Sequence, residues 1–156
     1  MQYRMQHYQL TAGQIDKLLQ QADTGRLGTI SDDGYPYVIA MHFVFYNGNI
    51  YLHGLPKGQK IDNIRHNPNV CFEVDELLAL VPGTDAACDT EAVYNSAVLT
   101  GNARILDNLQ AKRDVLNQLV EKYTPQFTGT DLPENMVKGT AVIEIEVTAC
   151  TGKYHK

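Results

Sequence analysis

Apolar and polar residues alternate along several short stretches of this chain, the pattern of β-strands with one covered face. Val70, Phe72 and Val74 alternating against Cys71 and Glu73 give a clear example. Turn residues such as the Asp-Asp-Gly and Asn-Gly runs separate these stretches. The alternation predicts six strands, at residues 26–31, 35–46, 49–53, 69–75, 92–106 and 141–147.

The longest of these strands, residues 35–46, is apolar on both of its faces. Tyr37, Ile39 and Met41 lie on one face, and Val38 and Ala40 lie on the other. A strand of this kind is covered on both sides. We therefore expect the protein core on one side and a partner or a ligand on the other. The Asn-Gly pair at 47–48 predicts a tight hairpin into the next strand.

Helical spacing of apolar residues is confined to three segments. Thr11 and Gln14 form a capping box ahead of the first helix, for which Gly25 is a candidate stop. A short helix is expected over residues 59–66, and a longer one after a cap at Asp107. Residues 76–91 and 124–139 read as irregular segments and loops. Because the strands come as hairpins and do not alternate with helices, the sequence predicts a mainly β, antiparallel barrel or sheet with peripheral helices.

Length and composition limit the number of domains, the binding partners and the cellular location that we expect. The 156 residues predict one domain, residues 1–156, and the net charge of −5 argues against nucleic-acid binding. No run of residues resembles a membrane span or a signal peptide. The three cysteines are scattered, which argues against disulfides and against a zinc site. We therefore expect a cytoplasmic protein that has no metal site and engages neither membrane nor nucleic acid.

One short segment stands out against the acidic composition. "YLHGLPKGQK", residues 51–60, leaves a hydrophobic strand and then places His53, Lys57 and Lys60 around two glycines. Backbone N–H groups at a helix start, together with lysine, suit a phosphate group. Gly58 would let the backbone approach such a ligand closely. A solvated loop is the alternative interpretation, and the turn alone does not decide between them.

Other reactive side chains form no recognisable catalytic set. Ser96 has no GxSxG context, and Cys88 has no identifiable base, so an ordinary thiol is expected there. His42, set among apolar residues, predicts a buried histidine with one hydrogen-bond partner. Glu144 and Glu146 alternate on one strand face and predict a solvated surface. No catalytic residue is assigned.

The order of these motifs resembles the pyridoxamine 5′-phosphate oxidase-like, FMN-binding split-barrel superfamily, and within it the nitroimidazole-resistance (Nim) branch. The resemblance spans about residues 8–154. The similar motifs are the Gly-Tyr-Pro-Tyr opening of the long strand at 34–37, the His53 to Lys60 turn, the Asn-Pro helix stop at 67–68, Ala87-Cys88-Asp89, the "YNSAVLTGNA" strand at 94–103 and the "TGKYH" ending at 151–155.

The resemblance implies a six-stranded split barrel that forms a homodimer, with FMN bound across the interface. The ring would lie against the long strand, the phosphate would sit in the following turn, and the partner subunit would contribute from the strand at 92–106. The cofactor-binding residues predicted in this way are Val38, Ile39, Ala40, Met41, His53, Gly54, Lys57, Gly58, Lys60, Tyr94 and Ser96.

The implied activity is that of an FMN-dependent oxidoreductase acting on a small molecule. The turn Gly58-Gln59-Lys60 departs from the basic, serine-containing turn of the oxidase proper, so a reductase using a nicotinamide donor, NAD(P)H, is the better expectation. The absence of GxGxxG implies that this donor docks transiently on the flavin. Nitro compounds are the acceptors that the resemblance implies. Two alternatives stay open: a carrier or sensor barrel that binds flavin or haem without fast turnover, and a relative that has lost its cofactor.

Overall fold

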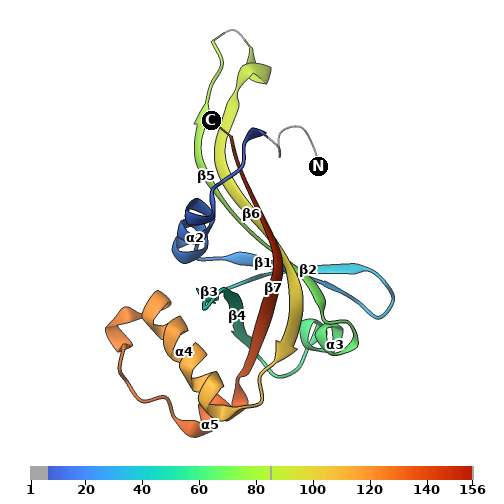
Figure 1. Ribbon diagram of the computed structural model, residues 1–156, viewed down its shortest axis with the longest axis vertical. Coiled ribbons are helices and arrows are strands. Elements are labelled where there is room, and N and C mark those ends of the chain that lie inside the picture. Colours follow the sequence, from blue (N-terminus) through green and yellow to red (C-terminus); the bar gives the residue numbers. More distant parts are fainter. Residues whose placement is uncertain (1–6, 85, 156) are drawn as a thin grey trace.

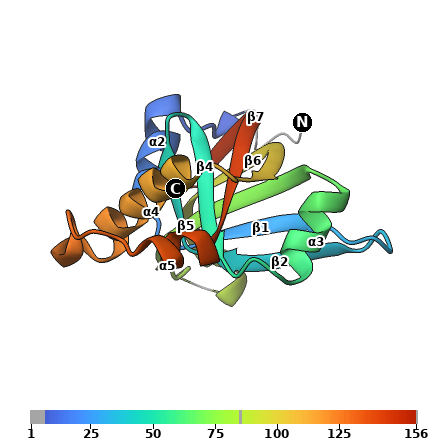
Figure 2. The same ribbon diagram turned by 90° about the horizontal axis from the view of Figure 1, so that it is seen from below.

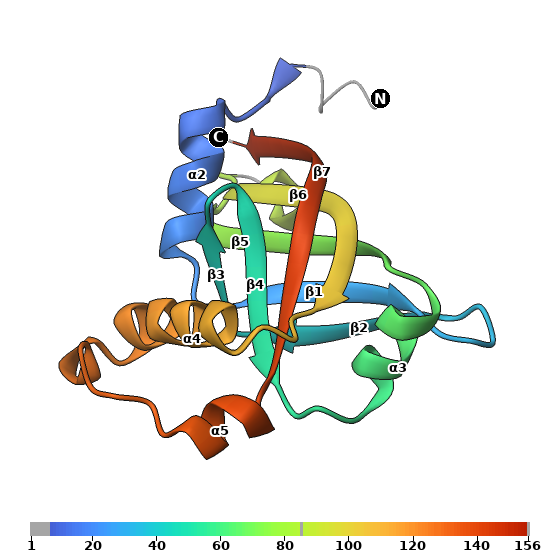
Figure 3. The same cartoon turned by 60° about the horizontal axis from the view of Figure 1, so that its bottom comes forward.

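The computed structural model describes residues 7–84 and 86–155, so the ends of the predicted domain, residues 1–6 and 156, lie outside it. Within the described residues, seven strands form one sheet in the order β2-β1-β5-β6-β7-β4-β3. All its neighbouring strands pair antiparallel. Figure 3 shows the sheet curling around a central space, with helices at its outside. The strands are β1 (Gly25–Ile30), β2 (Pro36–Met41), β3 (Phe43–Tyr46), β4 (Asn49–Gly54), β5 (Asn69–Val81), β6 (Glu91–Ile105) and β7 (Ala141–His155).

The mainly β, antiparallel prediction is therefore confirmed, but the predicted number of six strands is wrong by one. The continuous apolar run at 35–46 is split at His42 into β2 and β3. β2 pairs with β1, whereas β3 pairs with β4 at the opposite edge of the sheet. One apolar run thus passes from one edge of the sheet to the other.

Strands β5 and β7 are longer than their alternation predicted. β5 continues to Val81, through a bulge between Leu77 and Ala79, and pairs with β6 to form a long hairpin. The "TGKYH" ending, expected as a tail, continues β7 along β6. In Figure 1 the β5–β6 hairpin projects far beyond the rest of the molecule. This projecting pair of strands, residues 77–81 and 91–94, is called the arm below.

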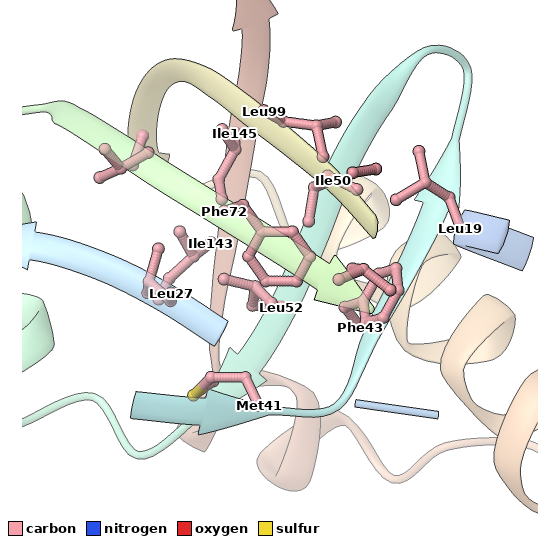
Figure 4. Close-up of a cluster of buried hydrophobic side chains, with 14 of the residues drawn as sticks. Leu19, Leu27, Met41, Phe43, Ile50, Leu52, Phe72, Leu99, Ile143 and Ile145 are labelled. Carbon is pink, nitrogen blue, oxygen red and sulfur yellow. The ribbon is translucent and has the colours of Figure 1, made fainter. Parts of the chain in front are cut away.

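The principal core lies inside the curled sheet. Phe43 and Phe72 meet edge to face with their ring centroids 5.0 Å apart, and both are fully buried. Figure 4 shows these rings among aliphatic side chains from β1, β4, β6 and β7. Gly25, expected as a helix stop, is instead the first residue of β1, and a Cβ atom there would lie 2.1 Å from Cζ of Phe72. The close ring explains why this position needs glycine.

The helices close the open sides of the sheet. α2 (Ala12–Gln21) has the predicted capping box. α3 (Gln59–His66) packs near β1, as Figure 2 shows. α4 (Leu109–Tyr123) is capped by Asn108 and not by Asp107, because the Asn108 side chain accepts the N–H of Ala111. The expected loop at 124–139 contains a 3₁₀ turn (Pro125–Phe127) and α5 (Glu134–Gly139).

A second, smaller core lies on the outer face of the sheet, beneath α4. It joins Val44, Tyr51 and Val142 to Val115 and Leu119 of that helix. Helix α4 therefore covers part of the outer face of β3, β4 and β7.

Glu144 lies two residues beyond Val142, on the same face of β7. It is 8% exposed and accepts hydrogen bonds from Tyr51 Oη, at 2.8 Å, and from Arg104. The predicted solvated face is thus wrong for Glu144. Burial alone would raise the pKa of its carboxyl, and the hydrogen bonds from Tyr51 and Arg104 outweigh burial and lower it. No helix in the described part of the chain is long and apolar enough to span a membrane.

Candidate functional site

The turn between β4 and α3 brings several of the predicted residues together. His53 and Gly54 end β4, and Lys60 lies in the first turn of α3. The Lys60 side chain folds back over the strand end, because a Cβ atom built on Gly54 would lie 3.2 Å from Lys60 Nζ. Lys57 is exposed on the connecting loop. Neither lysine forms an ion pair with any carboxylate that the structure describes.

Gly58 is the N-cap of α3 and shapes the turn. Its φ of 121° and ψ of 171° belong to a region that essentially only glycine adopts. It has no side chain to cap the helix, and the first intrahelical bonds run from Ile61 and Asp62 to its carbonyl. The N–H groups of Gln59 and Lys60 precede those bonds and, as at every helix start, are open to an external acceptor. An ammonium group and a helix start thus face the same turn.

His53 is half-buried beside this turn. Its Nδ1 atom is buried and has no hydrogen-bond partner among the described residues. The pKa of His53 is lowered, first by burial and then by the nearby His42 and Lys60. The lowered pKa favours the neutral imidazole, and one of its ring nitrogens is enclosed without a described partner.

His42 lies beside His53, and its predicted burial is wrong, because the residue is exposed. The β3–β4 register pairs Phe43 with Leu52, so its continuation sets His42 opposite His53. The His42 ring stacks on Tyr123 of α4, with centroids 4.5 Å apart. The two imidazoles line one pocket of about 490 Å³, whose other walls come from α4, α5 and the segment between them. We call this the α4–α5 pocket.

The residues predicted to hold the flavin ring lie on β2, and their side chains alternate between its two faces as expected. Met41 is buried in the core and Ile39 is packed against it. Val38 and Ala40 face outward and are exposed, Val38 by 64%. The outward face of β2 is thus uncovered in a single chain. Val38 lines a separate hollow of about 540 Å³ with residues of β1, β5, β6 and β7.

The residues assigned to a partner subunit's strand, Tyr94 and Ser96, lie on β6 near the arm. Tyr94 stacks on His155 at a centroid distance of 6.2 Å and lines a third hollow together with Cys88. Ser96 is only 8% exposed, so its hydroxyl is largely enclosed within its own chain. Within one chain, these two residues do not share a pocket with His53 or with Val38.

Sequence reasoning missed the roof of the α4–α5 pocket. Tyr123 lies in the helix predicted after residue 107, where nothing in the sequence indicates a pocket, and Met136 and Val137 lie in the segment 124–139 predicted as a loop. The signal for α5 was weak: Pro133 followed by Glu134, a combination that favours a helix start. A helix of six residues leaves little periodicity to detect.

Comparison with known proteins identifies the family. The sequence profile described as "Pyridoxamine 5'-phosphate oxidase" matches residues 11–154, nearly the whole chain. The chain belongs to this family. Membership accounts for the order of motifs from the capping box of α2 to the end of β7, and with them for the split-barrel fold. No curated protein matches the sequence.

Solved structures agree with this assignment. A putative 5-nitroimidazole antibiotic resistance protein from Bacteroides thetaiotaomicron is 26% identical, with a TM-score of 0.82 over 94% of this chain and 86% of its own. Two more distant structures share the fold. The FAD and heme binding protein from Mycobacterium smegmatis has a TM-score of 0.85 at 18% identity, covering 96% of this chain and 74% of its own. The flavocytochrome Anf3 from Azotobacter vinelandii has a TM-score of 0.81 at 19% identity, covering 94% and 68%.

Proposed function

We propose that this protein is an FMN-dependent oxidoreductase whose flavin phosphate is bound by the turn between β4 and α3. The observation that carries the proposal is the Lys60 ammonium group, which folds over Gly54 beside the start of α3 without a described carboxylate partner. A positive charge without a partner, placed at a helix N-terminus, is the arrangement that phosphate groups favour. Lys57 adds a second positive charge on the same loop.

The outward face of β2 is the complementary half of this flavin site. A flavin ring is flat and largely apolar, and it needs a flat apolar surface and backbone groups at its edge. Val38 and Ala40 offer that surface, and both lie on the strand that ends just before His42.

We further propose a homodimer that completes the site. Apolar side chains of the arm are unusually exposed: Leu77, Leu78, Leu80 and Val81 are between 48% and 61% accessible. Their positions are nearly consecutive, so apolar groups project from both faces of the arm. A second copy of the chain would cover them, and in the same assembly Tyr94 could reach the flavin of the partner.

A bound flavin would supply hydride transfer between a nicotinamide donor and a small-molecule acceptor, nitro compounds among them. The chain's own part is to hold the phosphate through Lys60, to shield one ring face with β2, and to place a neutral imidazole nearby. The 26% identical nitroimidazole resistance protein supports nitro compounds as the acceptor class. The protein would act in the cytoplasm.

Titration of the purified protein with FMN, followed by flavin absorbance and fluorescence, tests the proposal. We expect saturable binding, weakened by about tenfold to a hundredfold by Lys60→Ala, since a hydrogen bond to a charged group contributes about 1.5–3 kcal/mol. Lys17→Ala, an exposed change on α2, is the control and should bind FMN as the unaltered protein does. Anaerobic addition of NADPH or NADH should then bleach the bound flavin.

Failure of the folded protein to bind FMN would overturn the flavin site. Equal affinity in Lys60→Ala would overturn the placement of the phosphate. Binding without reduction by either nicotinamide would instead favour a flavin carrier or sensor.

A haem-binding carrier is the second candidate, favoured by two imidazoles in an apolar pocket. Both project from neighbouring strands toward the same pocket, so they would approach a haem iron from one side. A Soret band on addition of haemin, lost in His53→Leu, would support this candidate.

A further inference from the structure

The α4–α5 pocket has features that binding of a flavin phosphate does not explain. It is about 490 Å³ in volume and lies between the outer face of the sheet and the two helices. Figure 3 shows α4 and α5 on one side of the end of β4 and α3 on the other side. The pocket contains His42 and His53 but neither Lys57 nor Lys60. It is therefore adjacent to the proposed phosphate turn without being part of it.

Most of the pocket wall is apolar. Leu116, Leu119 and Val120 line it from α4, and Val137 from α5. No aspartate, glutamate, lysine or arginine is among its lining residues. A charged ligand would lose its hydration there without gaining a counterion. The lining therefore favours a neutral, largely apolar ligand.

The hydroxyl groups in the wall are already occupied. Thr140 Oγ1 donates to the Met136 carbonyl at 2.8 Å, and Thr124 Oγ1 lies 3.3 Å from the Val120 carbonyl. Tyr123 Oη accepts the N–H of Phe43 at 2.9 Å and lies 2.8 Å from the carbonyl of Asp23. The hydroxyl hydrogens of the wall are therefore already donated, and among the described polar side chains that line it only the imidazoles have no hydrogen-bond partner.

His53 is the better of these two polar groups. Its Nδ1 atom is buried without a described partner, whereas a buried polar atom usually has one. A rotation of the His53 ring that turns Nδ1 into the pocket would let a ligand group hydrogen-bond to it and remove this deficit. The stacked rings of His42 and Tyr123 add an aromatic wall, which favours a flat aromatic ligand.

From this inventory we infer that the α4–α5 pocket binds a neutral, planar aromatic compound with one hydrogen-bonding group directed at His53. His42, which lines the pocket, directly follows β2, the strand proposed to hold the flavin ring. The role of the pocket as the binding site of the flavin's second reactant therefore rests on the proposed function. The binding itself does not, because every group that carries it belongs to the pocket.

A pair of probes separates the apolar and polar parts of this inference. 2-Naphthol has a hydroxyl group, and naphthalene is the same ring system without it. The chain has no tryptophan, so naphthalene fluorescence can be followed without that background. We expect 2-naphthol to bind the protein in the absence of FMN, about fivefold more tightly than naphthalene, as one net hydrogen bond implies.

Two substitutions test the location. His53→Leu should weaken 2-naphthol binding about fivefold and leave naphthalene binding unchanged or tighter. Leu116→Phe fills the pocket from α4 and should weaken both probes at least tenfold. Leu109→Phe is the matched control, because Leu109 lies on the same helix and is not among the pocket residues.

Absence of binding, or binding unchanged in Leu116→Phe, would overturn the inference. Equal affinity for the two probes would overturn the hydrogen bond to His53. If His53→Leu does not fold, the ¹⁵N resonance of His53 Nδ1 in the unaltered protein serves instead, and it should shift much further with 2-naphthol than with naphthalene. Since the titrations contain no FMN, a failed flavin titration and a failed naphthol titration are independent results.

Discussion

Asn63 Nδ2 donates a 2.8 Å hydrogen bond to Thr29 Oγ1, and both residues are almost completely buried. Asn63 lies in α3 and Thr29 lies in β1, so this bond ties the helix of the proposed phosphate turn to the sheet. Gln59, in the first turn of the helix, donates in turn to Asn63 Oδ1 at 2.7 Å. The direction in which the start of α3 points is therefore fixed by a polar contact inside the protein.

Replacement of one member of this pair should destabilise the fold. Asn63→Leu leaves the Thr29 hydroxyl buried without its donor, and we expect a loss of about 1–3 kcal/mol in the free energy of unfolding. Urea denaturation of the single variants, of Thr29→Val and of the double variant measures it. The double variant should lose less than the sum of the two single losses. Simple additivity would show that the bond contributes nothing to stability.

Gly58→Ala should distort the turn even though space for a methyl group exists. No atom lies within 4 Å of a Cβ built there, but the φ of 121° is strained for any other residue. A cost of about 1–3 kcal/mol is expected, with weaker FMN binding as the turn relaxes. Gly13→Ala in α2 is the control and should stabilise the protein by about 0.5–1 kcal/mol. A turn that tolerates Gly58→Ala with full stability and FMN affinity would contradict this account.

The lowered pKa of His53 predicts a loss of stability in mild acid. Below its ordinary pKa of 6.5 the unfolded chain takes up a proton that the folded protein still excludes. The free energy of unfolding therefore falls as the pH decreases from 6.5 to the lowered pKa, and then this contribution is constant. Urea denaturation of the unaltered protein and of His53→Leu at several pH values between 7.5 and 5 should show a smaller decline in the variant. Parallel curves would contradict the prediction.

Lys122 should produce the corresponding effect at alkaline pH. Burial lowers its pKa to about 8, and its Nζ lies 4.0 Å from the centroid of the Phe43 ring. Between pH 8 and 10 the unfolded chain binds more protons, so the free energy of unfolding should rise, by about 1 kcal/mol after allowance for solvent screening. Lys122→Met should lack this rise, which the exposed control Lys17→Met should retain. The same rise in Lys122→Met would assign it to other groups.

Several features of this protein follow from short stretches of sequence alone. The capping box of Thr11 and Gln14 and the Asn-Gly hairpin at 47–48 form as predicted, because each depends on backbone geometry within a few residues. Alternation likewise located the strands, and the lysines and glycines of residues 54–60 marked the candidate phosphate turn. The resemblance to the split-barrel family came from the order of such local motifs along the chain.

Other features depend on contacts between distant residues. The apolar run at 35–46 gives no sign of its break at His42, because both halves have the same alternation and only their pairing partners differ. Glu144 alternates like a solvent-facing residue and is buried against Tyr51 of β4 and Arg104 of β6, which hydrogen-bond to it from the neighbouring strands. The α4–α5 pocket needs both the β3–β4 register, which sets His42 opposite His53, and a roof from residues 116–140. Local patterns record which side of a strand is apolar, whereas packing across the sheet decides what covers it.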